Sequence, residues 1–456
     1  MSSLWGSLFT PFLAQRPVCV MARCVLENLL DPRRLNALFE RTAKVQYTRE
    51  LAFSTLVDLM GQVVLGIQPS IHAAYQAQAQ AVGVSDQAVY DKLNHVELAV
   101  SAELVGHSAR QAAELIDALD ARLPPLLPGY RVKILDGNHL AATEHRLAEL
   151  RGIWAAPLPG TILAVLDPRR MLVHDVFLCQ DGEASERSLL DQVLPTAQRQ
   201  DLWIADRNFC TAGFLAGLDR RGAALVIRQH GQLKGELLGQ RRPQGATDTG
   251  RVFEQRLRIT DAQGQALVLR RITVELYQPT RDGETSIHIL TNLPGRIPAA
   301  RVAELYARRW TIEMMFHELT TTLICEIKTL GYPKAALFGF CLALLAYHAV
   351  AVIKAALRKA PGGKAAGAEV SGYYLALELR QTYPGMMVAI PPRHWRIFGD
   401  MPPEKLAGIL RTLIRQVDLS RYRRHPRGPK KPPPKKDRYK NGGHVATARL
   451  VAGRKR

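Results

Sequence analysis

The segment RVKILDGN, residues 131–138, marks the point at which the periodicity of the sequence changes from helical to strand-like. Its first six residues form an apolar, partly β-branched run that ends on Asp136, and this pattern predicts a short strand. A hairpin, a helix with a serine N-cap and two more buried strands are predicted to follow, over residues 162–179, 185–198, 201–206 and 223–229. This order predicts an α/β layer whose first and fourth strands each end on an acid.

The region before this layer, residues 1–128, shows apolar residues at helical spacing and is predicted to be all-helical. Within it, GVSDQAVYDKLNHV (83–96) has a turn at Gly83, a serine or aspartate N-cap and a short helix. The pattern resembles the second half of a helix-turn-helix, and a helical hairpin that only packs fits it equally well. Residues 1–128 are therefore a candidate DNA-binding region.

After the layer, residues 230–295 alternate apolar and polar positions, which predicts a β-rich antiparallel insertion. Its arginines, Arg256, Arg258 and Arg270 or Arg271, could face DNA or could only keep exposed strands soluble. A long helix that includes residues 301–320 is predicted to follow. The predicted organisation is a core at 129–229 and 296–358, a helical region at 359–420 and a basic tail at 421–456.

The chain carries a formal net charge of +20, which points to a polyanionic partner, either nucleic acid or an anionic membrane surface. Residues 421–456 hold fourteen Lys or Arg and a single acid among many Pro and Gly residues. This tail is predicted to be disordered in isolation and to bind phosphates without reading bases.

The longest apolar run, residues 335–353, reaches the length of a membrane span. We expect a buried core helix instead, because Gly339, Tyr347 and His348 favour a protein interior. The N-terminus lacks the pattern of a signal peptide, and the six cysteines show no CxxC spacing. A cytoplasmic protein without membrane association, disulfide or structural zinc is therefore expected.

Three side chains of the predicted long helix, Tyr306, Arg309 and Glu313, share one stripe at i, i+3 and i+7. Taken alone, the stripe also fits a solvated helix face, and Asp136 and Asp206 also fit ordinary turn chemistry. Open α/β sheets, however, bind ligands beyond their strand ends, where these two acids and Glu313 could converge. Clustered carboxylates need a cation, and an all-oxygen ligand set suits Mg²⁺ or Mn²⁺.

The segments DGN (136–138) and DRNF (206–209), followed by Tyr306, Arg309 and Glu313, resemble the signature of a known family. That family is the DDE transposases of the insertion-sequence-four group, named for its YREK motif. The resemblance covers roughly residues 130–345 and implies an RNase H-like catalytic core interrupted by a β-rich insertion. The 70 residues from Asp136 to Asp206 and the 107 from there to Glu313 accommodate that insertion.

The activity implied by this resemblance is DNA transposition in a prokaryotic cytoplasm, in association with the nucleoid. Asp136, Asp206 and Glu313 would hold two Mg²⁺ ions, for which Mn²⁺ can substitute, during attack on phosphorus by water and then by a DNA 3′-hydroxyl. The family implies binding of element ends and target DNA by a homodimer, with the helices after residue 335 between the copies.

The phosphate-binding residues implied by the family are Tyr306 and Arg309. Arg207 would either assist them or pair with an acid. One position departs from the motif, because the family's Lys lies seven residues after the Glu and here that residue is Thr320. His317 or Lys328 is the candidate replacement. The departure keeps open a second interpretation, a catalytically inactive, transposase-derived DNA-binding protein.

Overall fold

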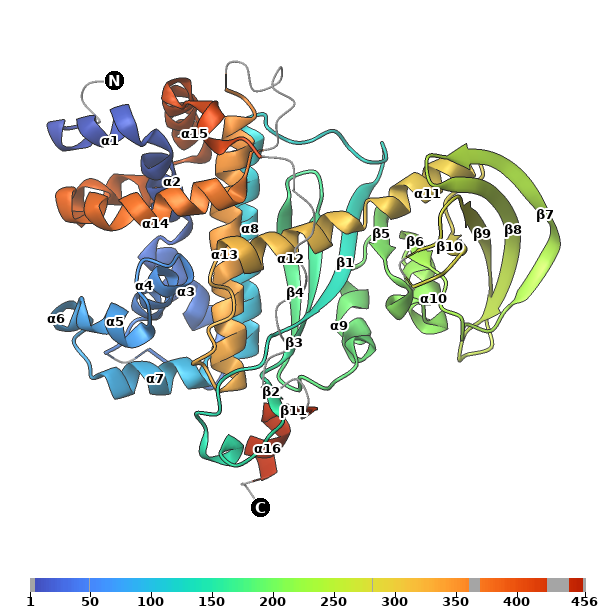
Figure 1. The fold of residues 1–456 in the computed structure, drawn as a ribbon, viewed down its shortest axis with the longest axis horizontal. Coiled ribbons are helices and arrows are strands. Elements are labelled where there is room, and N and C mark those ends of the chain that lie inside the picture. Colours follow the sequence, from blue (N-terminus) through green and yellow to red (C-terminus); the bar gives the residue numbers. More distant parts are fainter. Residues whose placement is uncertain (1–4, 49, 281, 361–369, 425–442, 454–456) are drawn as a thin grey trace.

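The protein is built around one large β-sheet, beside which helices from both ends of the chain form a second layer (Figure 1). The computed structural model describes residues 5–48, 50–280, 282–360, 370–424 and 443–453. Among these residues the sheet has nine strands, in the order β4-β3-β1-β5-β6-β10-β9-β8-β7. The strands are β1 (Arg131–His139), β3 (Thr161–Asp167), β4 (Leu172–Cys179), β5 (Asp201–Ala205), β6 (Ala224–Arg228), β7 (Glu236–Thr247), β8 (Gly250–Thr260), β9 (Ala266–Leu276) and β10 (Ser286–Thr291).

Five of these strands form the RNase H-like core that the family resemblance implies. β1 pairs antiparallel with β3, and β3 pairs antiparallel with β4. On its other side β1 pairs in parallel with β5, which pairs in parallel with β6. The order β4-β3-β1-β5-β6 with these directions is an RNase H-like sheet, so the predicted α/β fold class is confirmed.

The strands of this core are buried on both faces, which explains their near-continuous apolar sequences. On β1, Val132 and Ile134 belong to the larger apolar core, whereas Leu135 points into a smaller one on the opposite face. The larger core lies under α8 (Leu98–Ala118), α12 (Trp310–Thr322) and α13 (Pro333–Leu357), and the smaller under α9 (Leu190–Val193) and α10 (Ala212–Arg220).

The predicted β-rich insertion continues the core sheet instead of forming a sheet of its own. β10 pairs antiparallel with β6, and β9, β8 and β7 follow in turn. The outermost strand, β7, is exposed along most of its length and carries two irregularities in register, with Pro243 in between. Irregular, proline-containing edges discourage pairing with another chain.

The remaining helices form a further layer on the far side of α8 and α13, which lie between it and the sheet (Figure 1). They are α1 (Thr10–Gln15), α2 (Pro17–Leu29), α3 (Pro32–Thr42), α4 (Phe53–Val64), α5 (Ile71–Gln76), α6 (Ala79–Val82), α7 (Asp86–His95), α14 (Gly372–Ala389) and α15 (Pro403–Leu413). α7 begins as predicted, because the Ser85 hydroxyl accepts a hydrogen bond from the Ala88 amide. Val89 and Leu93 of α7 are fully buried, while its role in DNA binding stays a prediction.

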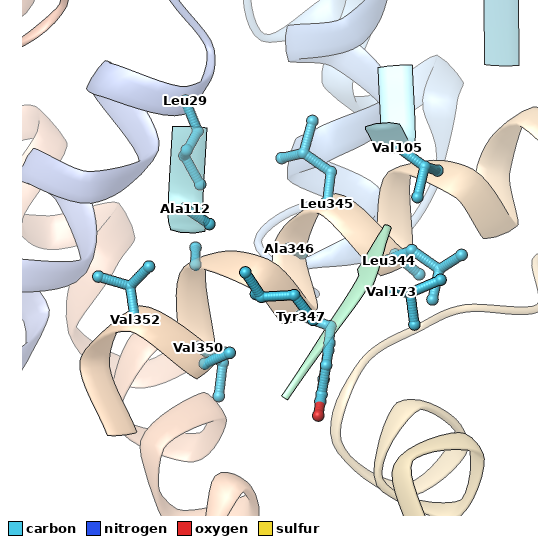
Figure 2. Close-up of a cluster of buried hydrophobic side chains, with 14 of the residues drawn as sticks. Leu29, Val105, Ala112, Val173, Leu344, Leu345, Ala346, Tyr347, Val350 and Val352 are labelled. Atoms are coloured by element: carbon cyan, nitrogen blue, oxygen red, sulfur yellow. The ribbon is translucent and has the colours of Figure 1, made fainter. Parts of the chain in front are cut away.

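The apolar run at 335–353 lies within α13, which is packed between this layer and the sheet. In the most apolar 18-residue window of α13, 94% of the residues are buried inside the protein. Figure 2 shows Leu344 and Val350 of α13 in one buried cluster with Leu29 of α2, Val105 of α8 and Val173 of β4. The length and apolarity of α13 therefore serve the core, as expected, and not a membrane span.

A buried histidine ties α13 to α8 and β4. His348 accepts a hydrogen bond from the Val173 amide through Nε2, at 3.2 Å, and its Nδ1 lies 2.9 Å from the Ser108 hydroxyl. The hydroxyl donates to the Val105 carbonyl, so Nδ1 carries the proton and donates to Ser108. Burial lowers the pKa of His348 from 6.5 to about 3.

We expect acid to destabilise the fold through this histidine. Below pH 6.5 the unfolded chain binds a proton at His348 that the folded state does not bind until about pH 3, so stability falls as the pH falls through this window. In chemical unfolding, the wild type should lose about 2 kcal/mol more stability between pH 6.5 and 5 than a variant in which His348 cannot titrate. His348→Gln retains an acceptor and a donor without titrating, and an unchanged pH dependence in that variant would contradict the assignment.

The end of the chain differs from the predicted disordered tail. Residues 444–446 form β11 (His444–Ala446), which pairs in parallel with β2 (Ala156–Leu158), and α16 (Thr447–Gly453) follows. Arg449 forms salt bridges with Asp181 and Glu183. The prediction of disorder is therefore wrong for residues 443–453, whereas residues 425–442 and 454–456 lie outside the described residues.

Candidate active site

Asp136 and Asp206 lie on neighbouring parallel strands at the same end of the sheet. β1 pairs with β5 so that Leu135 is opposite Ala205. Asp136 and Asp206 are the residues that follow these two. Asp206 follows the end of β5 directly, as predicted. Asp136 does not end its strand, because β1 continues to His139 through its pairing with β3.

The predicted long helix is two helices, and the break between them shapes the site. α11 (Ala299–Ala307) ends before Arg308, and α12 begins at Trp310. Backbone hydrogen bonds from Arg309 to Tyr306 and from Ile312 to Arg309 span three residues instead of four. This tighter winding replaces the continuous α-helix that was predicted.

The side chains of the predicted stripe nevertheless meet the two strand acids. The Tyr306 hydroxyl donates to Oδ1 of Asp206 at 3.3 Å. Nη1 of Arg309 lies 3.4 Å from Oδ2 of Asp136 and 2.5 Å from Oε1 of Glu313. Residues from three distant stretches of the chain therefore share one site at the end of the sheet.

Arg309 is the centre of this arrangement. The residue is only 8% exposed, and its guanidinium carbon lies 6.0 Å from the ring centre of Tyr306 and 5.4 Å from that of Trp310. Burial acts to lower the pKa of Arg309, but Tyr306 and the surrounding carboxylates outweigh it and raise the pKa. Nε is buried without a hydrogen-bond partner. The guanidinium is thus held as a permanent cation among acids, with one donor unused.

Burial raises the pKa of Asp136 to about 7, and the nearby carboxylates of Glu313 and Glu186 act in the same direction. Arg309 and the Gly137 amide oppose the rise without cancelling it. The charged form of Asp136 is therefore costly in the folded state, and this is typical of functional sites.

We expect Asp136→Asn to stabilise the protein at high pH in the absence of divalent ions. The folded state binds more protons than the unfolded state between pH 3.8 and 7, so the carboxyl lowers stability as the pH rises through this range. At pH 8 the free energy of unfolding of the variant should exceed that of the wild type by about 1–2 kcal/mol, and at pH 4 the two should be equal. Equal stabilities at pH 8, measured by chemical unfolding with chelator present, would contradict this.

Two residues near the strand ends were not predicted from the sequence. The Glu186 carboxylate, on the turn η3 (Glu186–Leu189), accepts a hydrogen bond from the Asn208 side chain at 2.5 Å and lies 3.7 Å from His139. Asn208 belongs to the DRNF segment, but Glu186 has no motif around it. Its only sequence signal is its place directly after a serine N-cap.

The other predicted phosphate-binding residues stand apart from this arrangement. Arg207 donates to Glu284 at 3.1 Å and shares that acid with Arg228, which agrees with the pairing alternative. Lys328 is exposed beyond the end of α12, and no contact joins it to the three acids among the described residues. Thr320 donates from its hydroxyl to the His317 carbonyl at 3.0 Å. Within the part of the chain that the structure describes, Lys328 therefore does not take the place of the missing lysine beside the acids.

The four arginines predicted to face DNA differ in their exposure. Arg270 forms a salt bridge with Glu254, and Arg271 donates to Gln229. Arg258 pairs with Glu236, although it remains exposed, as does Arg256. Arg256 and Arg258 are therefore the pair from the predicted set that is accessible to a partner.

The donor chemistry of the site fits a hard divalent cation, because all three acids offer carboxylate oxygens. Two of them, Asp136 and Glu313, face the same point, where Nη1 of Arg309 lies. Within the described residues, no group of three His, Cys, Asp or Glu side chains is close enough together to hold an ion. In this conformation the guanidinium supplies the positive charge that the acids require.

Comparison with known proteins relates the stretch of chain that carries these residues to transposases. A family model described as the transposase DDE domain matches residues 127–347, a span that includes all three acids. No curated protein matches the chain. Among solved structures, the chain is similar to a piggyBac transposase in a synaptic complex with hairpin DNA, with 10% identity over 86% of this chain and 84% of that chain, and a TM-score of 0.37. A score this low does not define a shared fold, whereas the family match supports a DDE transposase.

Proposed function

We propose that this protein is the DNA transposase of an insertion sequence of the YREK group, which binds the element's ends, cleaves them and joins them to target DNA. The observation that carries the proposal is the meeting of Asp136, Asp206 and Glu313 with Arg309 and Tyr306 at one end of an RNase H-like sheet. The match to the transposase DDE domain over residues 127–347 supports it.

The three acids would hold two Mg²⁺ ions, or Mn²⁺ in their place. When bound, such ions lower the pKa of an attacking hydroxyl and neutralise the leaving oxygen at phosphorus. The Tyr306 hydroxyl fixes one oxygen of Asp206, which leaves the other oxygen free to act as a ligand. Asp136 must lose its proton before it can serve as a ligand, so ion binding should release a proton near or below pH 7.

Arg309 would bind a DNA phosphate beside these acids. Its guanidinium presents several donors in a fixed plane. A phosphate that approached the guanidinium would bring its own negative charge to a cation now shared by Asp136 and Glu313. Binding of DNA would then weaken the hold of Arg309 on the acids.

A homodimer on paired DNA ends is part of the proposal, with its surface on the helices after residue 335 other than α13. The helices after residue 335 include α13, which is buried inside a single copy. The exposed apolar side chains Tyr373 and Val388 lie on α14, so α14 is available for a contact between copies. Localisation with the prokaryotic nucleoid is proposed together with the DNA-binding role.

The alternative function is a catalytically inactive DNA-binding protein derived from such a transposase, and Thr320 in place of the motif lysine favours it. The two are separated by incubating the protein with Mg²⁺ and DNA that carries the element's own ends. Strand-transfer products are expected. Retention of the DNA without cleavage would establish the alternative, and cleavage without joining would reduce the function to that of a nuclease.

A further inference from the structure

Glu186 connects the two strand ends that carry Asp136 and Asp206. Its side chain is only 15% exposed, although it is a glutamate on a short turn. One oxygen, Oε2, accepts a hydrogen bond from Nδ2 of Asn208, and the other, Oε1, lies 3.7 Å from Nε2 of His139. The carboxylate therefore has partners on both β1 and the segment that follows β5.

The Glu186 carboxylate also rests against the backbone of Gly137, the residue next to Asp136. A Cβ atom placed on Gly137 would lie 1.9 Å from Oε1 and 2.3 Å from Cδ of Glu186. Gly137 does not have a positive φ, so its backbone conformation does not require glycine. Instead, Gly137 is needed because it has no side chain, and the Glu186 carboxylate occupies the space where a Cβ atom would lie.

Asn208, the partner of Glu186, is held from two directions. Nε of Arg187 donates to the Asn208 carbonyl at 2.7 Å, while Glu186 accepts from the Asn208 side chain. Asn208 belongs to the turn η5 (Arg207–Phe209), which Asp206 begins by accepting hydrogen bonds from the Arg207 amide through its side chain and from the Phe209 amide through its carbonyl. The position of Asp206 is thereby coupled to the turn that carries Glu186.

We infer that Glu186 is a positioning residue for Asp136 and Asp206, and this inference rests on the proposed function. By accepting from Asn208 and filling the space above Gly137, it fixes the separation between Asp206 and Asp136. It acts through hydrogen-bond acceptance and shape, so glutamine can replace it. Loss of such an outer contact typically costs about 10- to 100-fold in metal affinity or activity.

The test compares Glu186→Ala, Asn208→Ala and the double variant in Mg²⁺-dependent cleavage of DNA carrying the element's ends. Each single variant should cleave about 10- to 100-fold more slowly, and the double variant should be no slower than either. Each should also need about tenfold more Mn²⁺ for half-maximal stabilisation against thermal unfolding, a readout that needs no catalysis. Asp191→Ala, an exposed acid in the same stretch of chain, is the matched control.

Two further variants keep the inference testable if Glu186→Ala does not fold. Glu186→Gln should behave like the wild type in both measurements, because its amide oxygen still accepts from Asn208. Gly137→Ala should behave like Glu186→Ala, because the added methyl group displaces the carboxylate without removing it.

Wild-type cleavage by Glu186→Ala or Gly137→Ala, alongside an inactive Asp136→Asn, would overturn the inference and leave the proposed function intact. The inference would also be overturned if the double variant lost the product of the two single losses in cleavage rate. A Glu186→Gln variant that cleaved as slowly as Glu186→Ala would overturn it too. If the wild-type protein neither cleaves nor responds to Mn²⁺, the proposed function fails and the inference fails with it.

Discussion

Asp136→Asn should bind DNA carrying the element's ends with unchanged affinity and should cleave it at least ~10³-fold more slowly than the wild type. Asparagine keeps the size of the side chain and the acceptor for the Gly137 amide, so the strand should stay in place. It removes the negative charge that a divalent ion requires. The measurements are a DNA-retention assay and a single-turnover cleavage assay, each with Mg²⁺.

Asp191→Asn controls for loss of an acid elsewhere, because Asp191 is exposed on α9. A normal cleavage rate for Asp136→Asn would show that Asp136 is not a metal ligand, and the proposed site would then be wrong. If the variant lost both DNA retention and cleavage, Asp136 would instead act in DNA binding.

Arg309→Lys is the second change with a large expected effect. Arginine contacts both Asp136 and Glu313 through Nη1 and keeps a further nitrogen in the same plane for a phosphate, whereas lysine keeps the positive charge but has no second nitrogen. Cleavage should therefore fall by about 10²-fold, with a lower unfolding temperature in the absence of DNA, because a buried pair of contacts is lost.

The adjacent Arg308 provides the matched control, because it is exposed and its replacement by lysine should leave both quantities unchanged. Wild-type cleavage by Arg309→Lys would mean that only the charge of Arg309 matters. The proposed contact with a DNA phosphate through the planar guanidinium would then be incorrect.

The parts of this structure that could be predicted from sequence are those with a local signal. The change of period at residue 131 predicts the α/β layer, and the apolar runs before Asp136 and Asp206 predict that both acids lie at one end of it. The helical spacing of Tyr306, Arg309 and Glu313 predicts a shared face. That face survives the break at Arg308 because a tightened turn shifts the side chains without reversing them.

The parts that could not be predicted depend on contacts between distant segments. Nothing near Glu186 distinguishes it from a surface acid, and its place becomes clear only when Gly137 and Asn208 lie on either side of it. The pairing of β11 with β2 joins two three-residue strands that lie far apart in the chain, and each is too short to show a period. The break before Trp310 has no Gly or Pro around it, so nothing in the sequence marks it.

The unbroken hydrogen bonding from β4 to β7 has a mechanical consequence for DNA held by the outer strands. β6 pairs with β5 on one side and with β10 on the other, so Arg256 and Arg258 are attached to the strand before Asp206 through backbone alone. No flexible joint between described strands separates them. If DNA bound to those arginines and exerted a force on them, the sheet that sets the spacing of the acids would deform. DNA binding at the outer strands and catalysis at the acids would then be mechanically coupled.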